Sequence, residues 1–355
     1  MALSSDDSFK QAIASFQAGR LIDAEQFFKK VLRLQPNHVA ALNLLSVLLT
    51  SLGRYTEAEP YIKAALGLNS NSDATLYNYG IILKSLNRPI EALERFSQAL
   101  SINATVAETW NNRGTVFNDL KRYDDAIIDF NKAISLQPNY SEAFCNKGKS
   151  LAELRRHDEA FAAYDKALSL KSDLAVAWLG RGNVFFDLKR YDEAFAAYDK
   201  ALAIKPDLED AWLDRGNVFL ELKRYDEAFA AYDKALAIKL DLEDAWLGRG
   251  NIFFDLKRYD EAFAAYDKAL ALKPDLAEAW LGRGNGFFDL KRYDVAFAAY
   301  EKAVALKPDL AEPWLGRGNV FKQIQRFDEA FAAYDKALAL KPDLFGAEGL
   351  RLDVK

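Results

Sequence analysis

The sequence predicts an all-α protein, built as a solenoid of helical hairpins. One segment, Ala175–Leu208, recurs with unchanged length from Glu209, Glu243, Ala277 and Ala311. Within the segment, apolar residues fall three and four positions apart, which is typical of helices and not of strands. Because one hairpin buries too little apolar surface to be stable alone, successive copies are expected to stack on one another.

The first half of each copy predicts one helix. In the first of these copies, Ala177–Leu188 places apolar side chains such as Trp178 and Val184 on a broad helical face. Gly182 falls in the middle of this helix, where glycine costs roughly 1 kcal/mol relative to alanine. We therefore expect Gly182 to mark a point where two helices come close together.

The second half predicts another helix, over Glu193–Ile204, with small and aromatic residues on one face. Asp192 is expected to cap this helix, and Asp207 is expected to cap the next first helix. Pro206 ends the second helix because its ring cannot continue the backbone hydrogen bonding. A tight turn at Lys189–Arg190 joins the two helices.

Seven positions of this copy resemble the tetratricopeptide repeat, a family of helix-turn-helix units of about 34 residues. They are Trp178, Gly182, Phe185, Ala194, Tyr198, Ala201 and Pro206. The resemblance implies a right-handed superhelix whose first helices line a concave groove for protein partners. It indicates the fold and leaves the pathway open, since the same scaffold serves many functions.

Counting in steps of one unit divides the chain into ten units without insertions. The unit starts are Ser5, Val39, Asp73, Ala107, Ser141, Ala175, Glu209, Glu243, Ala277 and Ala311. We expect a tail over residues 1–4, one array over residues 5–344, and a partial capping helix over residues 345–355. The first unit has Ser8 and Ala12 where Trp and Gly are usual, so it is the most divergent.

Composition narrows the class of protein. The chain has 355 residues, of which 28% are charged, and a net charge of −5, which disfavours a role in binding nucleic acid or membrane surfaces. The first residues lack a basic segment followed by an apolar one, and no apolar run approaches the roughly 20 residues of a membrane span. The single cysteine excludes an intrachain disulfide. A cytoplasmic location is therefore expected.

The sequence offers no catalytic constellation. Its two histidines, His38 and His157, lie far apart in sequence and have no Cys or His neighbours. Cys145 has no base near it in sequence. Carboxylates recur at the same positions of every unit, whereas catalytic pairs are usually unique. We therefore expect no enzyme activity, cofactor or metal for this chain.

The resemblance implies that positions 2, 5, 9, 12 and 13 of each unit face the groove. The asparagines there are Asn183, Asn217, Asn251, Asn285 and Asn319, the apolar residues are Leu179, Leu213, Leu247, Leu281, Phe186, Phe254 and Phe288, and the acidic residues are Asp187, Asp210, Glu221, Asp244, Asp255, Glu278 and Asp289. An asparagine amide can both donate to and accept from a peptide backbone. The hypothesis is a ladder of asparagines that holds an extended, basic and apolar segment.

A second set of asparagines occupies position 6 of earlier units. These residues are Asn78, Asn112 and Asn146. They resemble the asparagine ladder in the repeat region of O-linked N-acetylglucosamine transferases. Later units have Gly180, Asp214 and Gly248 at this position, so the ladder does not continue.

Three functions fit these observations. The leading prediction is a non-catalytic scaffold that binds an extended peptide or a partner domain. The first alternative is the substrate-recruiting region of a bacterial O-linked N-acetylglucosamine transferase-like enzyme, whose catalytic domain is absent from these residues. The second alternative is a structural array that forms homo-oligomers through its terminal repeats.

Overall fold

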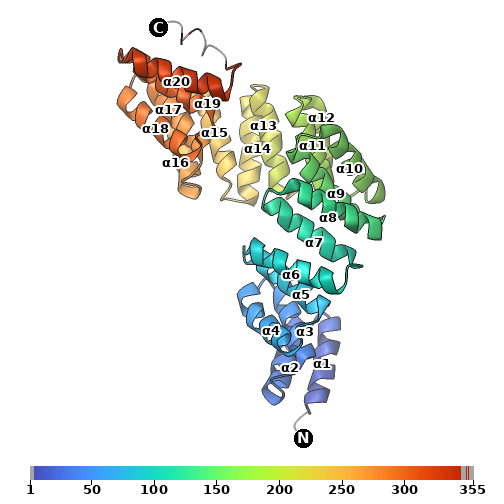
Figure 1. The fold of residues 1–355 in the computed structure, drawn as a ribbon. Coiled ribbons are helices and arrows are strands. Elements are labelled where there is room, and N and C mark those ends of the chain that lie inside the picture. Colours follow the sequence, from blue (N-terminus) through green and yellow to red (C-terminus); the bar gives the residue numbers. More distant parts are fainter. Residues whose placement is uncertain (1–3, 345–348, 350, 352–355) are drawn as a thin grey trace. The chain divides into compact units, whose positions relative to one another are not determined.

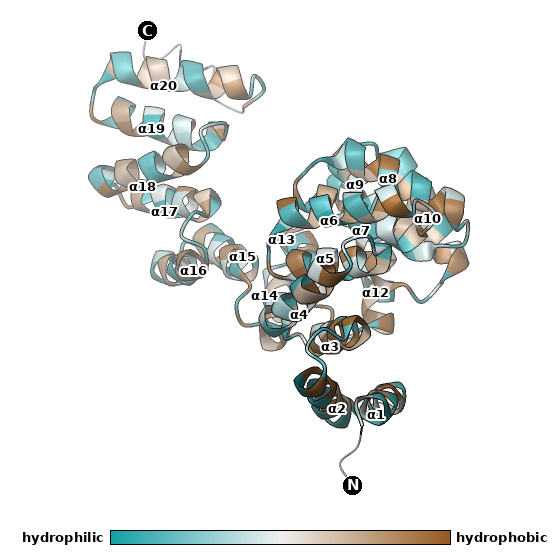
Figure 2. Ribbon diagram, turned by 60° about the horizontal axis from the view of Figure 1, so that its bottom comes forward, coloured by the Kyte–Doolittle hydropathy of each residue, from teal (hydrophilic) through white to brown (hydrophobic). Residues whose placement is uncertain are grey.

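The computed structural model describes residues 4–344, 349 and 351, and these residues form twenty helices and no strand (Figure 1). Each first helix has 13 residues and each second helix has 14 residues, as in α13 and α14. Every first helix begins at the first residue of a unit predicted from the sequence. Figure 2 shows hydrophilic and hydrophobic residues mixed on the labelled helices, as expected when one side of each is buried. The all-α fold with consecutively packed helix pairs is confirmed.

The chain divides into two compact units, Met1–Val184 and Phe185–Lys355, and the division falls inside α11 (Ala175–Asp187). The first unit contains α1 (Ser5–Gln17), α2 (Leu21–Leu34), α3 (Val39–Ser51), α4 (Tyr55–Leu68), α5 (Asp73–Ser85), α6 (Pro89–Ile102), α7 (Ala107–Asp119), α8 (Tyr123–Leu136), α9 (Ser141–Glu153) and α10 (His157–Leu170). The second contains α12 (Tyr191–Ile204), α13 (Glu209–Glu221), α14 (Tyr225–Ile238), α15 (Glu243–Asp255), α16 (Tyr259–Leu272), α17 (Ala277–Asp289), α18 (Tyr293–Leu306), α19 (Ala311–Gln323) and α20 (Phe327–Leu340). The expectation of one continuous array stays a prediction.

The turn within each pair is closed by the backbone. Lys223 adopts a left-handed conformation with φ of 56°, and Arg224 N–H donates to the Phe219 carbonyl at 2.8 Å. This arrangement is the Schellman motif, which usually has glycine at the left-handed position. Glycine does occupy the equivalent position at Gly19 and Gly53 of the first two pairs.

The predicted side-chain caps at Asp192 and Asp207 are wrong. The residue before α12 is Arg190, which makes no side-chain cap, and the residue before α13 is Leu208, which makes none either. The left-handed turn leads the chain directly into α12, so Asp192 falls in its first helical turn. A carboxylate there still favours the helix dipole without capping a backbone N–H.

A tyrosine holds each pair of the second unit together. Tyr266 of α16 is 1% exposed, and its ring lies against Gly250 of α15 and Gly282 of α17. A β-carbon at Gly282 would lie 2.5 Å from Tyr266 Cζ, closer than van der Waals contact allows. The glycines are therefore needed at close approaches, as predicted, and the partner is a tyrosine ring.

Arginines link one pair to the next. Arg283 of α17 pairs with Asp267 of α16 at 2.8 Å, and its guanidinium lies 5.1 Å from the centre of the Trp280 ring. The pattern reaches the last described residue, since Arg351 pairs with Asp335 at 2.8 Å. The remainder of the predicted cap over residues 345–355 lies outside the described residues, apart from Gly349.

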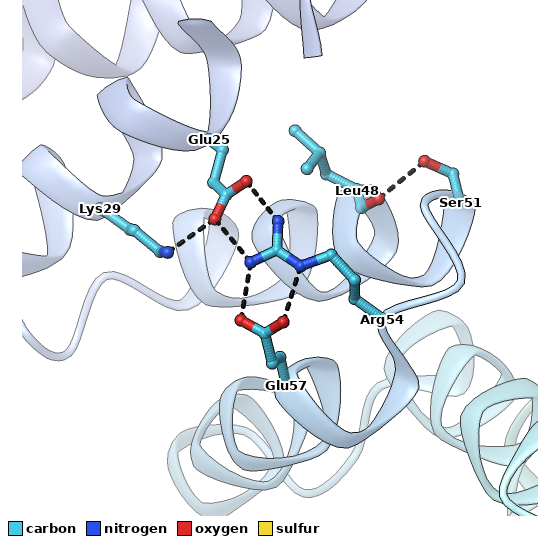
Figure 3. Close-up of polar contacts among 6 residues, drawn as sticks. All are labelled: Glu25, Lys29, Leu48, Ser51, Arg54 and Glu57. Atoms are coloured by element: carbon cyan, nitrogen blue, oxygen red, sulfur yellow. Dashed lines mark hydrogen bonds and ion pairs between the residues drawn. The ribbon is translucent and has the colours of Figure 1, made fainter. Parts of the chain in front are cut away.

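In the first pairs of the chain, the arginine before the second helix forms ion pairs, whereas in later pairs it lies over an aromatic ring. Arg54, in the turn before α4, bonds to Glu25 of α2 at 2.7 Å and to Glu57 at 2.6 Å, while Lys29 also contacts Glu25 (Figure 3). Hydrogen bonds from Arg54 and Lys29 lower the pKa of Glu25. In later pairs the equivalent arginine lies over a phenylalanine ring, as Arg258 does over Phe253 at 4.8 Å.

Candidate functional site

The candidate site is the surface of the second unit formed by α13, α15, α17 and α19, which we call the first-helix face. These helices contact one another in succession, while each packs its other side on a second helix. Side chains that are buried neither against the next first helix nor against the second helix lie on this face, where a partner can reach them.

Acidic side chains dominate this face. Asp210, Glu221, Asp255 and Asp289 are exposed. Glu278, by contrast, is half-buried and pairs with Lys307 of the same pair at 3.0 Å. The predicted acidic residues therefore divide into exposed carboxylates and at least one that a lysine already neutralises.

Asp244 lies among other carboxylates. It is exposed as a residue, yet its carboxyl is partly desolvated, and this desolvation, followed by the charges of Glu243 and Glu278, raises its pKa. Lys273 opposes the shift without cancelling it. A cationic ligand would stabilise the ionised carboxyl, because it would offset the desolvation as well as the neighbouring negative charges.

Apolar side chains lie between the acidic ones. Leu247, Phe254, Leu281 and Phe288 are half-buried, so part of each side chain remains accessible. Leu213 is only 9% exposed and belongs mainly to the core. Leu179, Asn183, Phe186 and Asp187 belong to α11, where the two compact units divide.

Tyrosines that the sequence analysis did not single out extend the face. Tyr225 donates its hydroxyl to Asp255 at 3.1 Å, and Tyr259 donates to Asp289 at 3.1 Å. The Tyr259 ring also contacts Phe254, with 6.0 Å between ring centres. The sequence carries this signal, because a tyrosine precedes each of these acids by 30 residues.

The predicted groove asparagines of the second unit bond to buried tyrosines of their own pairs. Asn217 accepts a hydrogen bond from the buried Tyr232 hydroxyl at 2.9 Å, and Asn251 accepts one from Tyr266 at 3.0 Å. Asn285 and Asn319 bond in the same way to the tyrosine 15 residues further along the chain. The amide oxygen is therefore engaged within the pair, and the Nδ2 group of Asn217 also donates to Asp214 at 3.5 Å.

The position-6 asparagines of the first unit also make internal bonds. Asn112 donates to the Tyr77 hydroxyl at 3.0 Å, and Asn146 donates to Asn111 Oδ1 at 3.0 Å. Both bonds join neighbouring first helices, while Asn78 is half-buried. Most later units have glycine at position 6, where a buried tyrosine of the preceding pair occupies the space beside it.

The equivalent surface of the first unit has a different chemistry. Lys84 donates to Thr115 Oγ1 at 2.6 Å, and burial, opposed by Asp119 and reinforced by Lys149, lowers its pKa. Lys84 therefore has the Thr115 hydroxyl and the more distant Asp119 carboxylate beside it, whereas acidic and aromatic groups dominate the face of the second unit.

Cys145 is buried, and His38 caps a helix. Burial raises the pKa of the Cys145 thiol to about 12, which keeps it protonated and unreactive at neutral pH. His38 Nδ1 accepts from Ala41 N–H at 3.1 Å and so caps α3. Residues 4–344, 349 and 351 contain no group of three potential metal ligands, and none of their helices is long and apolar enough to cross a membrane.

Family models described as tetratricopeptide repeats match most of the chain. The matched residues are 15–74, 107–140, 141–174, 182–223, 216–257, 250–290, 284–325 and 311–344. The chain belongs to the tetratricopeptide repeat family. No curated protein matches this tetratricopeptide repeat chain.

Solved structures share the fold of this tetratricopeptide repeat chain at low sequence identity. One chain in the crystal structure of the APC/C hetero-tetramer Cut9–Hcn1 is 14% identical to this chain. The match covers 99% of this chain and 97% of the other, with a TM-score of 0.58. Yeast Tom70 is 17% identical over 99% of this chain and 87% of its own, with a TM-score of 0.54. A tetratricopeptide repeat protein from Parabacteroides merdae is 20% identical over 70% of this chain and 98% of its own, with a TM-score of 0.56. At these identities the likeness shows the fold alone.

Proposed function

We propose that the chain is a non-catalytic interaction scaffold whose first-helix face binds an extended partner segment with basic and apolar side chains. The observation that carries the proposal is the alternation of exposed acids with half-buried apolar residues on neighbouring first helices. The Asp244 carboxyl also favours a cationic ligand, which would offset its desolvation and the charges of Glu243 and Glu278.

The asparagines contribute less than a full backbone clamp would. The oxygen of Asn251 already accepts from Tyr266, so it is less available as an acceptor for a peptide N–H, and the contribution left to this residue is donation from Nδ2 to a peptide carbonyl. Replacing Asn251 by alanine would also leave a buried hydroxyl without its acceptor, at a cost of about 1–3 kcal/mol. Asparagine variants therefore mix binding with stability, and the acids are the better probes.

The test uses a triple variant, E221Q/D255N/D289N. Each change removes a charge and keeps an oxygen that can accept the hydrogen bond from a tyrosine such as Tyr225 or Tyr259. The matched control is D192N/D226N/D260N, which removes three exposed charges from the first turns of second helices. The ligands are peptides with alternating Lys and Leu, compared with peptides in which Glu replaces Lys.

The expected result is preference for the basic peptides, with affinity that falls as salt rises. The triple variant should bind them roughly 5–20-fold more weakly, since exposed ion pairs each contribute about 0.2–1 kcal/mol. The control should change affinity by less than about twofold. Preference for the acidic peptides, or equal losses in both variants, would reject the proposed site.

The other readings of the sequence have less support. Neither the matched families nor the three structures described above is named as a glycosyltransferase, so the transferase-like alternative keeps only the position-6 asparagines in its favour, and these are bonded internally. Homo-oligomerisation and a cytoplasmic location remain predictions.

A further inference from the structure

A cavity opens on the first unit where the second and third helix pairs meet, beside α4, α5 and α6, which are neighbours in Figure 1. Its volume is about 370 Å³. Leu66 of α4, Leu76 of α5, and Arg95 and Gln98 of α6 line it, together with Ser70 of the turn that joins α4 to α5. The cavity therefore combines an apolar wall with a few polar groups, as binding sites for specific ligands usually do.

The repeated sequence explains why a cavity lies at this place. Leu76 occupies position 4 of its copy, the position at which other copies carry all six tryptophans of the chain, Trp110, Trp178, Trp212, Trp246, Trp280 and Trp314. A smaller cavity, of about 280 Å³, lies at the corresponding place one copy earlier, beside Leu32 and Tyr61, and position 4 there is Leu42. Both cavities therefore occur where a leucine leaves unfilled the space that an indole ring takes in other copies.

The later copies show how the chain holds an indole ring at this position. Trp212 Nε1 donates to the Pro206 carbonyl, in the turn before its helix, at 2.9 Å. The Lys234 ammonium lies 4.1 Å from the centre of the same ring, and the Arg215 guanidinium lies 5.3 Å from it. A backbone acceptor at the ring edge and cations against the ring therefore hold the tryptophan.

The cavity keeps these features without an indole of its own. Ser70 occupies the position of Pro206, so it supplies the backbone carbonyl at this point of the copy. Gln98 replaces the lysine at the position of Lys234, and a cation comes instead from Arg95, at a position where the five later copies have alanine.

Arg95 can contact an occupant through the face of its guanidinium. Its edge is engaged, because Nη1 donates to Gln98 Oε1 at 2.8 Å and Nη2 lies 3.4 Å from Glu94 Oε2. The guanidinium also lies 5.7 Å from the centre of the Tyr79 ring. A carboxylate ligand needs free N–H groups, whereas an aromatic ring is attracted to the guanidinium face. The contacts of Arg95 therefore favour an aromatic occupant over an anionic one.

We propose that this cavity binds a tryptophan side chain of a partner protein, in the place that the chain's own tryptophans fill in other copies. The indole ring packs against Leu66 and the Arg95 guanidinium, and its N–H donates to the Ser70 carbonyl. A buried tryptophan is the kind of anchor that supplies much of the affinity of a protein interface. The site lies in the first unit, so it is independent of the acidic first-helix face of the second unit.

The experiment uses the full chain and an uncharged, end-blocked peptide, Gly-Ser-Xaa-Ser-Gly, in which Xaa is 5-fluorotryptophan. Fluorine NMR follows the peptide alone, since the protein contains no fluorine. A saturable shift is expected at roughly millimolar peptide, because one side chain supplies the affinity. The N1-methyl analogue, which lacks the indole N–H, should bind roughly threefold to tenfold more weakly. A trifluoroleucine peptide should bind at least about fivefold more weakly, because it has no ring face for Arg95.

Two variants test the cavity itself. Leu76→Trp restores the residue of the other copies, so the chain's own indole should fill the cavity and weaken peptide binding roughly tenfold or more. Arg95→Ala introduces the alanine of the later copies and should weaken binding roughly twofold to fivefold. Circular dichroism checks that both variants keep the helical content of the wild type.

The matched control is Leu42→Trp, which makes the same change at the smaller cavity and should leave binding unchanged. E221Q/D255N/D289N should also leave it unchanged, because the peptide is uncharged and the site lies in the first unit. Undiminished binding to Leu76→Trp, or equal affinity for the trifluoroleucine peptide, would overturn the proposal. Loss of binding in Leu42→Trp or in E221Q/D255N/D289N would overturn it too, by placing the peptide at the other cavity or on the first-helix face.

Discussion

The contact between Tyr266 and Gly282 predicts that Gly282→Ala lowers stability, whereas glycine to alanine in a helix usually raises it. Glycine to alanine inside a helix normally stabilises it by about 1 kcal/mol. At Gly282 the added methyl group would lie 2.5 Å from Tyr266 Cζ, so α17 must move away from α16 or the ring must leave its position. Overpacking of this kind costs about 1–3 kcal/mol. Because a contact of 2.5 Å forces the ring or the helix to shift, the cost should lie near the upper end of that range, about 2–3 kcal/mol. After the gain in helix propensity, the net effect of Gly282→Ala should be destabilisation by about 1–2 kcal/mol.

The tyrosine hydroxyl should determine part of this cost. Its bond to Asn251 holds the ring against Gly282. In the first unit, Asn112 and Asn146 carry side chains at position 6, and the preceding pairs there have phenylalanine in place of tyrosine. Tyr266→Phe should therefore relieve Gly282→Ala, with a coupling energy of at least about 0.5 kcal/mol in a double-mutant cycle.

Hydrogen exchange measures the effect locally. The peptide over residues 285–289 is distinguishable from the other copies because it contains Gly286. Exchange there should be roughly 5–30-fold faster in Gly282→Ala. Gly67→Ala is the control, because a β-carbon at Gly67 in α4 meets no atom within 4 Å and should slow local exchange. Unchanged or slower exchange in Gly282→Ala, or the same loss in the Tyr266→Phe background, would refute the reasoning.

Three other predictions follow from single contacts. Although burial opposes the shift, hydrogen bonds from Lys63, Arg88 and Tyr79 lower the pKa of Glu59 from 4.5 to about 2, so its stabilisation is complete above pH 4.5 and is lost as pH falls toward 2. Hydrogen exchange of α4 should accelerate over that range in wild type but much less in Glu59→Gln, and identical profiles would contradict the assignment. Lys223→Gly should stabilise α13 and α14 by about 0.5–1 kcal/mol by removing left-handed strain, and a lower midpoint in urea would count against it. Cys145 should react with iodoacetamide far more slowly than free cysteine at pH 8, and rapid labelling of the native protein would show that the thiol is accessible.

The repeat made the helices predictable, because its period and apolar spacing recur in every copy. The helix ends were not predictable in the same way. The turn at Lys223 depends on a left-handed backbone conformation, which a lysine in the sequence does not indicate. The hydrogen bonds between asparagines and tyrosines could have been predicted in part from the sequence. Asn217, Asn251 and Asn285 are each followed 15 residues later by a tyrosine.

The tyrosine that lies between two glycines has a consequence for how such a chain changes length. Each late copy carries both partners of the contact, since Gly248 receives Tyr232 of the preceding pair and Tyr266 packs against Gly282 of the next. If unequal recombination added or removed one whole copy in this region, the two copies at the new junction would therefore still pair a tyrosine with a glycine. Copy number can vary there without a compensating mutation, whereas a junction with the early pairs would set an ion pair such as Glu25–Arg54 against an aromatic surface.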